Sequence, residues 1–350
     1  MKAEKNQKSP WKISLILGIL ILMLPGCLDI WITTDIHRDG SISQIIVFQG
    51  DSTEITEVPF ALMKEGDWKR EWTKPEKDKY KLVVTKEFKS VKELNKTMNP
   101  ADTNLQVVRI NSTLNRKFRW FFTRYVYEQT ALNANPFKEL DYRKYLNEEE
   151  IRLLCKKEDD RKEDPGFDTI AFKDTEKRFD DYIFRSMFEN FYRTLTSILS
   201  EDKSLSLTKQ NLDPQKDIIY RYLIDSTKGE SPDEILEGIG QVVNHPDIQT
   251  IRTKYLSRFD SFQQKLKFYQ AASDDNYKFA VRMPGLLLQT NSPKIEGAET
   301  GWELTYYDFY FKEYRMTAES RVVNSWAFIV AGLILLVALV SLIATLIRKR

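Results

Sequence analysis

Cysteine is nearly absent from this chain of 350 residues, which contains only Cys27 and Cys155. Two cysteines cannot build the disulfide framework on which small secreted domains depend. Cys155 lies in an apolar helical pattern, which favours a buried structural thiol over a reactive one. Histidine is equally scarce, since His37 and His245 are far apart and have no partners at ligand spacing. The sequence therefore argues against a histidine-based zinc site and against a Ser-His-Asp triad.

An excess of either charge is also missing, because 53 Lys and Arg residues balance 51 Asp and Glu residues. The sequence has no excess of basic residues of the kind that indicates nucleic-acid binding. Its composition of 42% hydrophobic and 30% charged residues is typical of a folded globular protein. The acidic clusters at 148–150, 159–160 and 274–275 lack the spacing of a calcium loop and lie beside lysine or arginine. We interpret them as solvated faces. We thus expect no catalytic residue, no cofactor, no metal ligand and no nucleic-acid partner, and we expect a protein that is not an enzyme.

Long apolar runs occur at the two ends of the chain. The first, residues 13–24, follows four lysines and is about 12 residues long, whereas a membrane-spanning helix needs about 20. It ends in Leu24-Pro25-Gly26-Cys27, after which the sequence becomes polar at once. This order is typical of a secretory signal peptide covering residues 1–26.

The residues at the end of this signal resemble the lipobox of bacterial lipoproteins, with Leu24 at position −3, Gly26 at −1 and Cys27 as the new first residue. The resemblance implies that the Cys27 thiol accepts a diacylglyceryl group and that the chain carries fatty acids such as palmitate. Two or three acyl chains hold a protein stably on a membrane where one does not. The alternative is an uncleaved signal anchor in which Cys27 is a bystander.

The second apolar run, residues 326–347, is uncharged and long enough to span a bilayer. Trp326 marks the outer interface, and Arg348-Lys349-Arg350 lies on the cytoplasmic side by the positive-inside rule. We therefore expect a doubly anchored protein in the bacterial cytoplasmic membrane, with its body on the extracytoplasmic (periplasmic) side. Cys27 would then hold the first strand at the bilayer surface, near the point where the last strand leads into this helix.

The body between the anchors is predicted to be α+β, with an antiparallel β-sheet domain and a large helical insertion. A discontinuous β-rich domain is expected over residues 27–134 and 273–321, a helical insertion over 135–272, and a transmembrane helix with a basic tail over 322–350.

Strand signals are clearest at residues 28–50, where Ile30, Ile32, Thr34 and Ile36 share one face and an Asp-Gly turn follows. Further strands are expected at 67–74, 80–88, 105–110, 116–128, 277–282 and 302–311. Arginine and aromatic residues are interleaved within 116–128. These residues could stack on nucleic-acid bases or form a two-sided sheet strand. An extracytoplasmic location favours the sheet strand.

Helix signals dominate the middle of the chain. Asp174 is expected to cap a helix over 174–200, and Ser231 to cap one that begins with Pro232. A single helix is expected over 246–272, because apolar residues recur there at helical spacing.

The overall layout resembles the LppM-like group of bacterial lipoproteins. The shared features are Cys27 before an Asp-Gly hairpin, a late turn from Met283-Pro284-Gly285 to Thr290-Asn291, the Trp302 strand and the C-terminal helix. The resemblance covers residues 24–50 and 277–347, and it implies an α+β domain with a curved antiparallel sheet tethered outside the cytoplasmic membrane. It carries over no catalytic residue, and the helical insertion departs from a compact version of the domain.

Three functions follow as hypotheses. The first is a non-enzymatic lipoprotein that presents an interaction surface near the membrane to an unknown protein partner. The second is a binder or carrier of a lipid or other apolar ligand, suggested by the aromatic strands at 118–127 and 302–311. The third is an envelope enzyme without a recognisable motif.

Overall fold

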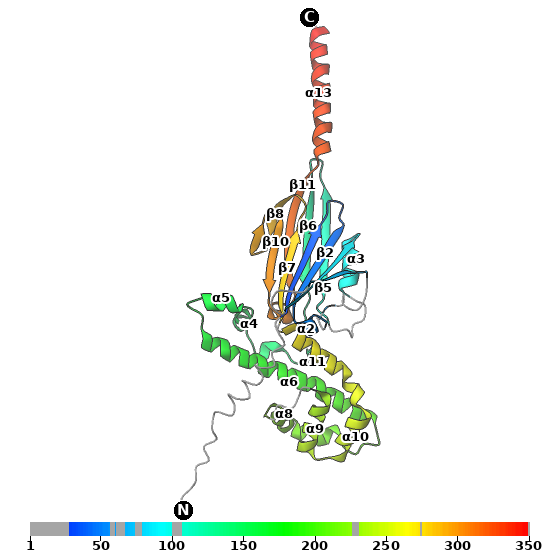
Figure 1. The fold of residues 1–350 in the computed structure, drawn as a ribbon, viewed down its shortest axis with the longest axis vertical. Coiled ribbons are helices and arrows are strands. Elements are labelled where there is room, and N and C mark those ends of the chain that lie inside the picture. Colours follow the sequence, from blue (N-terminus) through cyan, green and yellow to red (C-terminus); the bar gives the residue numbers. More distant parts are fainter. Residues whose placement is uncertain are drawn as a thin grey trace, which may run out of the picture.

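The computed structural model describes residues 28–56, 60, 67–73, 79–99, 107–225, 231–273 and 275–348. Leu24, Gly26 and Cys27 lie outside the described residues, as do the last two residues of the basic tail. Within this part of the chain the fold is α+β, as predicted: two β-sheets stand between a group of helices at one end and α13 (Ser325–Arg348) at the other (Figure 1).

The larger sheet has seven strands in the order β3-β4-β2-β1-β7-β10-β9. Its strands are β1 (Asp29–Ile36), β2 (Ile42–Gly50), β3 (Lys69–Thr73), β4 (Tyr80–Phe88), β7 (Asn276–Arg282), β9 (Lys294–Glu296) and β10 (Glu299–Leu304). The β1–β2 hairpin is confirmed, with Ile30, Ile32, Thr34 and Ile36 on its buried face. The sheet is not purely antiparallel, because β1 pairs in parallel with β7.

The smaller sheet was not expected as a separate unit. It has four strands in the order β5-β6-β11-β8, namely β5 (Ile110–Phe118), β6 (Phe122–Ala131), β8 (Leu286–Thr290) and β11 (Tyr314–Val323). Residues 116–128 are not one strand but the two arms and the tip of the β5–β6 hairpin. Gly285 precedes β8 with a φ of +80°, and a Cβ there would lie 2.3 Å from the Arg321 carbonyl oxygen, so this turn requires glycine.

The two sheets bury a partly polar layer between them. Thr34 Oγ1 donates to Gln44 Oε1 across β1 and β2 (3.0 Å), and Tyr127 OH donates to Ser112 Oγ across β5 and β6 (2.9 Å). Burial raises the pKa of Tyr127 to about 12, and the hydroxyl therefore stays protonated. Because these buried groups have partners, they fix the position of the strands without the cost of an unsatisfied polar atom.

Helices occupy the chain between β6 and β7, and we call residues 142–273 the helical head. The head contains α4 (Glu148–Leu154), α5 (Glu158–Glu163), α6 (Thr169–Glu201), α7 (Lys209–Leu212), α8 (Lys216–Asp225), α9 (Pro232–Val243), α10 (Pro246–Lys254) and α11 (Asp260–Ser273). Elsewhere lie α2 (Ser52–Thr56), α3 (Val91–Met98) and α12 (Tyr306–Tyr310). The cap at Ser231 is confirmed, since its hydroxyl accepts from Glu234 N.

Two helix boundaries differ from the expectation. α6 begins five residues earlier than predicted, because Asp168 accepts hydrogen bonds from Ile170 N and Ala171 N (both 2.9 Å). The helix expected over 246–272 is broken at Tyr255, where φ and ψ are −122° and 12°. A short 3₁₀ turn then leads into α11.

The strand expected over 302–311 is also wrong beyond Leu304. Thr305 ends it and caps α12, since Asp308 accepts from both the Thr305 amide (2.8 Å) and its hydroxyl (3.0 Å). Tyr306, Phe309 and Tyr310 are buried, and each is at most 1% exposed to solvent. Of the two aromatic segments that suggested an apolar-ligand site, these residues of 302–311 thus belong to the core.

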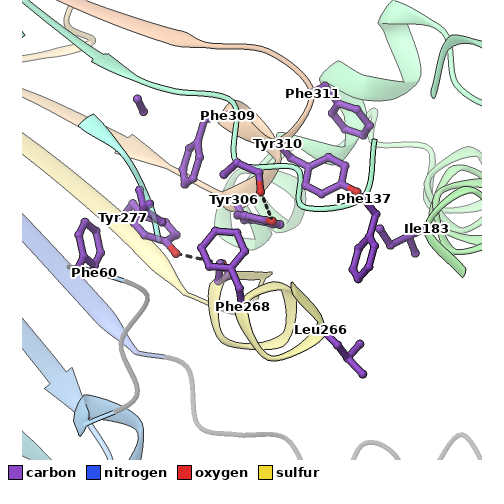
Figure 2. Close-up of a cluster of buried hydrophobic side chains, with 14 of the residues drawn as sticks. Phe60, Phe137, Ile183, Leu266, Phe268, Tyr277, Tyr306, Phe309, Tyr310 and Phe311 are labelled. Atoms are coloured by element: carbon purple, nitrogen blue, oxygen red, sulfur yellow. Dashed lines mark hydrogen bonds between the residues drawn. The ribbon is translucent and has the colours of Figure 1, made fainter. Parts of the chain in front are cut away.

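Aromatic side chains around α12 join the head to the sheets (Figure 2). Tyr306 OH donates to the Ala134 carbonyl (2.9 Å) after β6, and Tyr277 OH on β7 donates to the Ala272 carbonyl (3.2 Å) of α11. Phe179 of α6 packs edge-on against Tyr310 with ring centres 5.5 Å apart. The head and the sheets therefore share one continuous core.

The strand directions place the start of β1 and the start of α13 at opposite ends of the sheets. The Leu28 carbonyl accepts from Asn276 N (3.0 Å), three residues after α11, so β1 starts at the head end. The turn after β1 lies towards the opposite end, where Tyr125 OH donates to the Arg38 carbonyl (2.6 Å). The expectation that the first strand starts beside the start of the last helix is therefore wrong, and about 30 Å of strand lies between them.

Candidate functional site: the β5–β6 tip and the start of α13

The tip of the β5–β6 hairpin carries a cluster of exposed aromatic residues. Phe118 and Thr123 form the last cross-strand pair, and Arg119 N donates to the Phe122 carbonyl (2.8 Å) to close the turn. Phe118, Trp120 and Phe121 are 59%, 47% and 42% exposed. Rings of this size are normally buried, so their grouping at one tip marks a contact surface.

Asn324 fastens this tip to the start of α13. Its Nδ2 donates to the carbonyls of Arg119 (2.8 Å) and Trp120 (3.3 Å), and its Oδ1 accepts from Thr123 Oγ1 (3.1 Å). The backbone N–H of Asn324 also donates to the Phe121 carbonyl (2.9 Å). One side chain therefore satisfies three polar groups of the turn and fixes the direction in which the chain enters the helix.

Aromatic contacts extend the same junction. Trp326 stacks on Phe118 with ring centres 6.2 Å apart and meets Trp120 edge-on at 5.3 Å. Phe121 packs against Phe328, two residues further along the helix, with ring centres 4.9 Å apart. Among the described residues α13 is the one helix long and apolar enough to cross a membrane, and an 18-residue window of it has a mean hydropathy of 3.0.

Cations line the outward face of the smaller sheet just behind the tip. Lys117 lies opposite Arg124, and Arg124 lies opposite Arg321, so the three form one row across β5, β6 and β11. We call these residues the cationic row. Arg124 donates to Glu319 Oε2 (2.5 Å), and this hydrogen bond raises the pKa of the guanidinium further above its usual range. In the described part of the chain, neither Lys117 nor Arg321 has an anionic partner.

Replacing Asn324 with alanine should loosen the tip. The change removes three side-chain hydrogen bonds, two of which satisfy turn carbonyls, and we expect a local loss of about 2 kcal/mol. Hydrogen–deuterium exchange of peptides covering residues 117–124 should then accelerate by roughly thirtyfold. Asn291→Ala is the matched control. Asn291 makes similar side-chain hydrogen bonds with Arg315 and Thr317, which both lie on β11 further from α13. Equal exchange in both variants would contradict the assigned role of Asn324.

The other residues considered in the sequence are not brought together. Cys155 ends α4 half-buried, and burial next to Asp308 raises its pKa to about 12, so the thiol is protonated and unreactive at neutral pH. His37 bonds with Ser43 in the first hairpin, whereas His245 caps α10 by accepting from Asp247 N. No group of three or more potential metal ligands occurs within the described ranges.

The helical head carries a shallow open groove of about 520 Å³ between α9 and α10. Its wall mixes Leu236 and Ile248 with Gln241, Asn244 and Arg252. Arg252 is already engaged, since it donates to both carboxylate oxygens of Asp233 (2.9 and 2.7 Å). The groove therefore presents no free charged group for a ligand.

Comparisons with known proteins add little to this geometry. A scan against models of protein families and a search of curated proteins both give no match. Among solved structures the chain is similar to the folded domain of LppM from Mycobacterium tuberculosis, determined by NMR, with 9% identity over 92% of this chain and 97% of that one. The TM-score is 0.30, and a similarity at this level says nothing about sites or activity.

Proposed function

We propose that this protein is a non-enzymatic bacterial envelope lipoprotein that holds its helical head away from the membrane as a docking surface for a partner protein. α13 spans the cytoplasmic membrane with its basic tail inside and sets the position of the head. Lipid on Cys27 is a separate anchor at the head end, about 30 Å from the start of α13, so it does not enter the bilayer beside α13 while the head stands away from the membrane. The observation that carries this proposal is the position of the head at the end of the sheets opposite α13 (Figure 1).

The distance matters because it changes what the head can reach. The sheets hold the head about 30 Å beyond the start of α13, because β5, β6 and β11 are nine to ten residues long. The shared aromatic core keeps the head from swinging on a linker. A partner that binds the head therefore does so about 30 Å from the bilayer surface. The sequence had suggested an interaction surface close to the membrane.

Lipidation at Cys27 is compatible with the first folded residues. Leu28 is 2% exposed, and its carbonyl already accepts a hydrogen bond from Asn276. The folded body thus begins immediately after the predicted cleavage position. Removal of residues 1–26 would leave every described strand intact.

The surface best suited to a partner lies on α6 and α8. Phe184 on α6 and Ile218 and Ile224 on α8 are 48%, 60% and 46% exposed. The two helices are held together by Lys216 with Glu189 (2.6 Å) and by Tyr220 OH, which donates to Asp181 (3.1 Å). Exposed apolar groups on a rigid helix pair are the usual centre of a protein interface.

Substituting two of these residues should remove the partner. We expect crosslinking in intact cells, followed by purification of the full chain, to recover one reproducible partner protein. The double variant Phe184→Ser and Ile218→Ser should lower its recovery at least tenfold, because apolar anchors at an interface centre contribute about 2 kcal/mol each. Ile295→Ser on β9 is the control, since Ile295 is 56% exposed but outside the head. Equal recovery with both variants would remove α6 and α8 from the proposal.

A further inference from the structure

We propose that the cationic row of Lys117, Arg124 and Arg321 binds the phosphate groups of anionic lipids in the leaflet that α13 enters. Trp120 and Phe121 at the tip then lie among the lipid headgroups. The inference rests on the proposed insertion of α13, but it assigns a separate surface and a separate chemistry to the smaller sheet.

The first argument is the arrangement of charge. Like charges directly opposite one another on neighbouring strands are destabilising, yet three cations occupy one row here. Glu319 neutralises Arg124 alone. Arg119 in the turn is a further cation beside the tip, whereas Arg116 lies on the opposite face of β5, over the Tyr125 ring, and donates to the Asp39 carbonyl. The row is therefore a cationic surface, because the protein supplies one carboxylate, Glu319, for its three positive charges in the described part of the chain.

The second argument is the position of the row. Arg321 is two residues before Val323, which is about 7 Å along a strand, and Asn324 then leads into α13. The polar layer of a bilayer is about 6 Å thick on each side of the hydrocarbon. Lys117 of the row directly precedes Phe118, whose ring stacks on Trp326. When Trp326 lies at the hydrocarbon interface, the row is therefore at the depth of the phosphates.

The aromatic residues fit the same depth. Tryptophan and tyrosine gather where the hydrocarbon meets the headgroups, because one part of the ring is apolar and the other is polar. Trp120 contacts Trp326 directly, so both rings share one level. The same mixture of arginine and aromatic residues would also suit nucleic acid, but its continuity with α13 favours the lipid surface.

Quenching of tryptophan fluorescence by brominated lipids tests the inference. The full chain is placed in nanodiscs of phosphatidylcholine that contain a fixed fraction of either brominated phosphatidylglycerol or brominated phosphatidylcholine. Wild-type protein should show at least a fivefold preference for the anionic lipid, since each of the two unpaired cations near a charged bilayer contributes about that factor. Lys117→Gln with Arg321→Gln should bring the ratio near one while leaving the Arg124–Glu319 pair in place.

The control is Lys144→Gln with Arg221→Gln, which removes two exposed cations from the helical head and should leave the preference intact. Equal preference in the row variant and in wild type would overturn the inference. Loss of preference on adding millimolar glycerol phosphate would also overturn it, because the site would then take soluble phosphate. Failure of wild type to enter nanodiscs would contradict the insertion of α13 itself. Entry with equal quenching by both lipids would contradict only the cationic row.

Discussion

Phe179→Ala is expected to lower the free energy of unfolding by about 4 kcal/mol, because a large ring is removed from a packed core. Phe179 is 2% exposed on α6. Its ring contacts Tyr307, Tyr310 and Phe311 on and after α12, with centres 5.2 to 5.8 Å apart. The resulting cavity lies where the head meets the sheets. The loss should therefore weaken the connection that sets the position of the head.

Urea unfolding of the full chain in detergent, followed by circular dichroism, measures this loss. Ile170→Ala on the same helix is the control, since Ile170 is 75% exposed and should change stability by less than about 0.5 kcal/mol. A second, earlier transition in Phe179→Ala would show the head unfolding separately from the sheets. A loss as small as that of the control would contradict the shared core between α6 and α12.

Features governed by neighbouring residues were predictable from the sequence. The first hairpin follows from alternation and an Asp-Gly turn, and Gly40 indeed has a φ of +95°. Ser90 caps α3 by accepting from Glu93 N (3.4 Å), as its spacing indicates. These signals are local, because the groups that satisfy one another lie within a few residues.

Two adjacent elements at the C-terminal end of the body were missed. The alternation at 302–311 suggested a strand, but Thr305 and Asp308 form a capping box and start α12. β11 was overlooked because half of its buried face consists of the small Ala318 and the polar Ser320, which leaves little hydrophobic contrast with the outward face. The buried residues are Met316, Ala318, Ser320 and Val322. Tertiary packing determines β11, whereas the Thr305–Asp308 capping box is a local signal that the alternating pattern concealed.

The candidate site was missed for a related reason. The sequence showed basic and aromatic residues at 116–128, and Trp326 as an interface marker. Their connection depends on Asn324, which bonds to Arg119 across a separation of 205 residues. Likewise, the row that joins Lys117 to Arg321 exists only because β11 lies beside β6. Contacts at such separations are set by the fold as a whole.

Removing both anchors should release the protein, whereas removing either one should not. The lipid-free variant carries Cys27→Ser and an ordinary cleavable signal in place of residues 1–26, since an uncleaved signal would itself hold the membrane. The helix-free variant ends after Asn324. α13 has 24 residues, of which an 18-residue window has a mean hydropathy of 3.0, and two or more acyl chains also give stable attachment. Each single variant should therefore sediment with membranes after a carbonate wash, and the combined variant should not.

Each single variant also tests one anchor separately. Release of the helix-free protein would show that Cys27 carries no lipid, and labelling with a fatty-acid analogue provides an independent measurement. Release of the lipid-free protein would show that α13 does not span the bilayer. Sedimentation of the combined variant would point to a third attachment, for which the tip aromatics are the first candidates.

The two single variants should meet the membrane with opposite ends. Cys27 directly precedes Leu28, which lies at the head end of β1, whereas α13 leaves from the β5–β6 tip. In the lipid-free form Trp120 should lie at the bilayer, so Trp120→Phe should reduce quenching by brominated lipids. In the helix-free form about 30 Å of sheet separates Trp120 from the acyl chains, and the same substitution should leave quenching unchanged. Equal effects in both forms would contradict the strand direction that separates the two anchors.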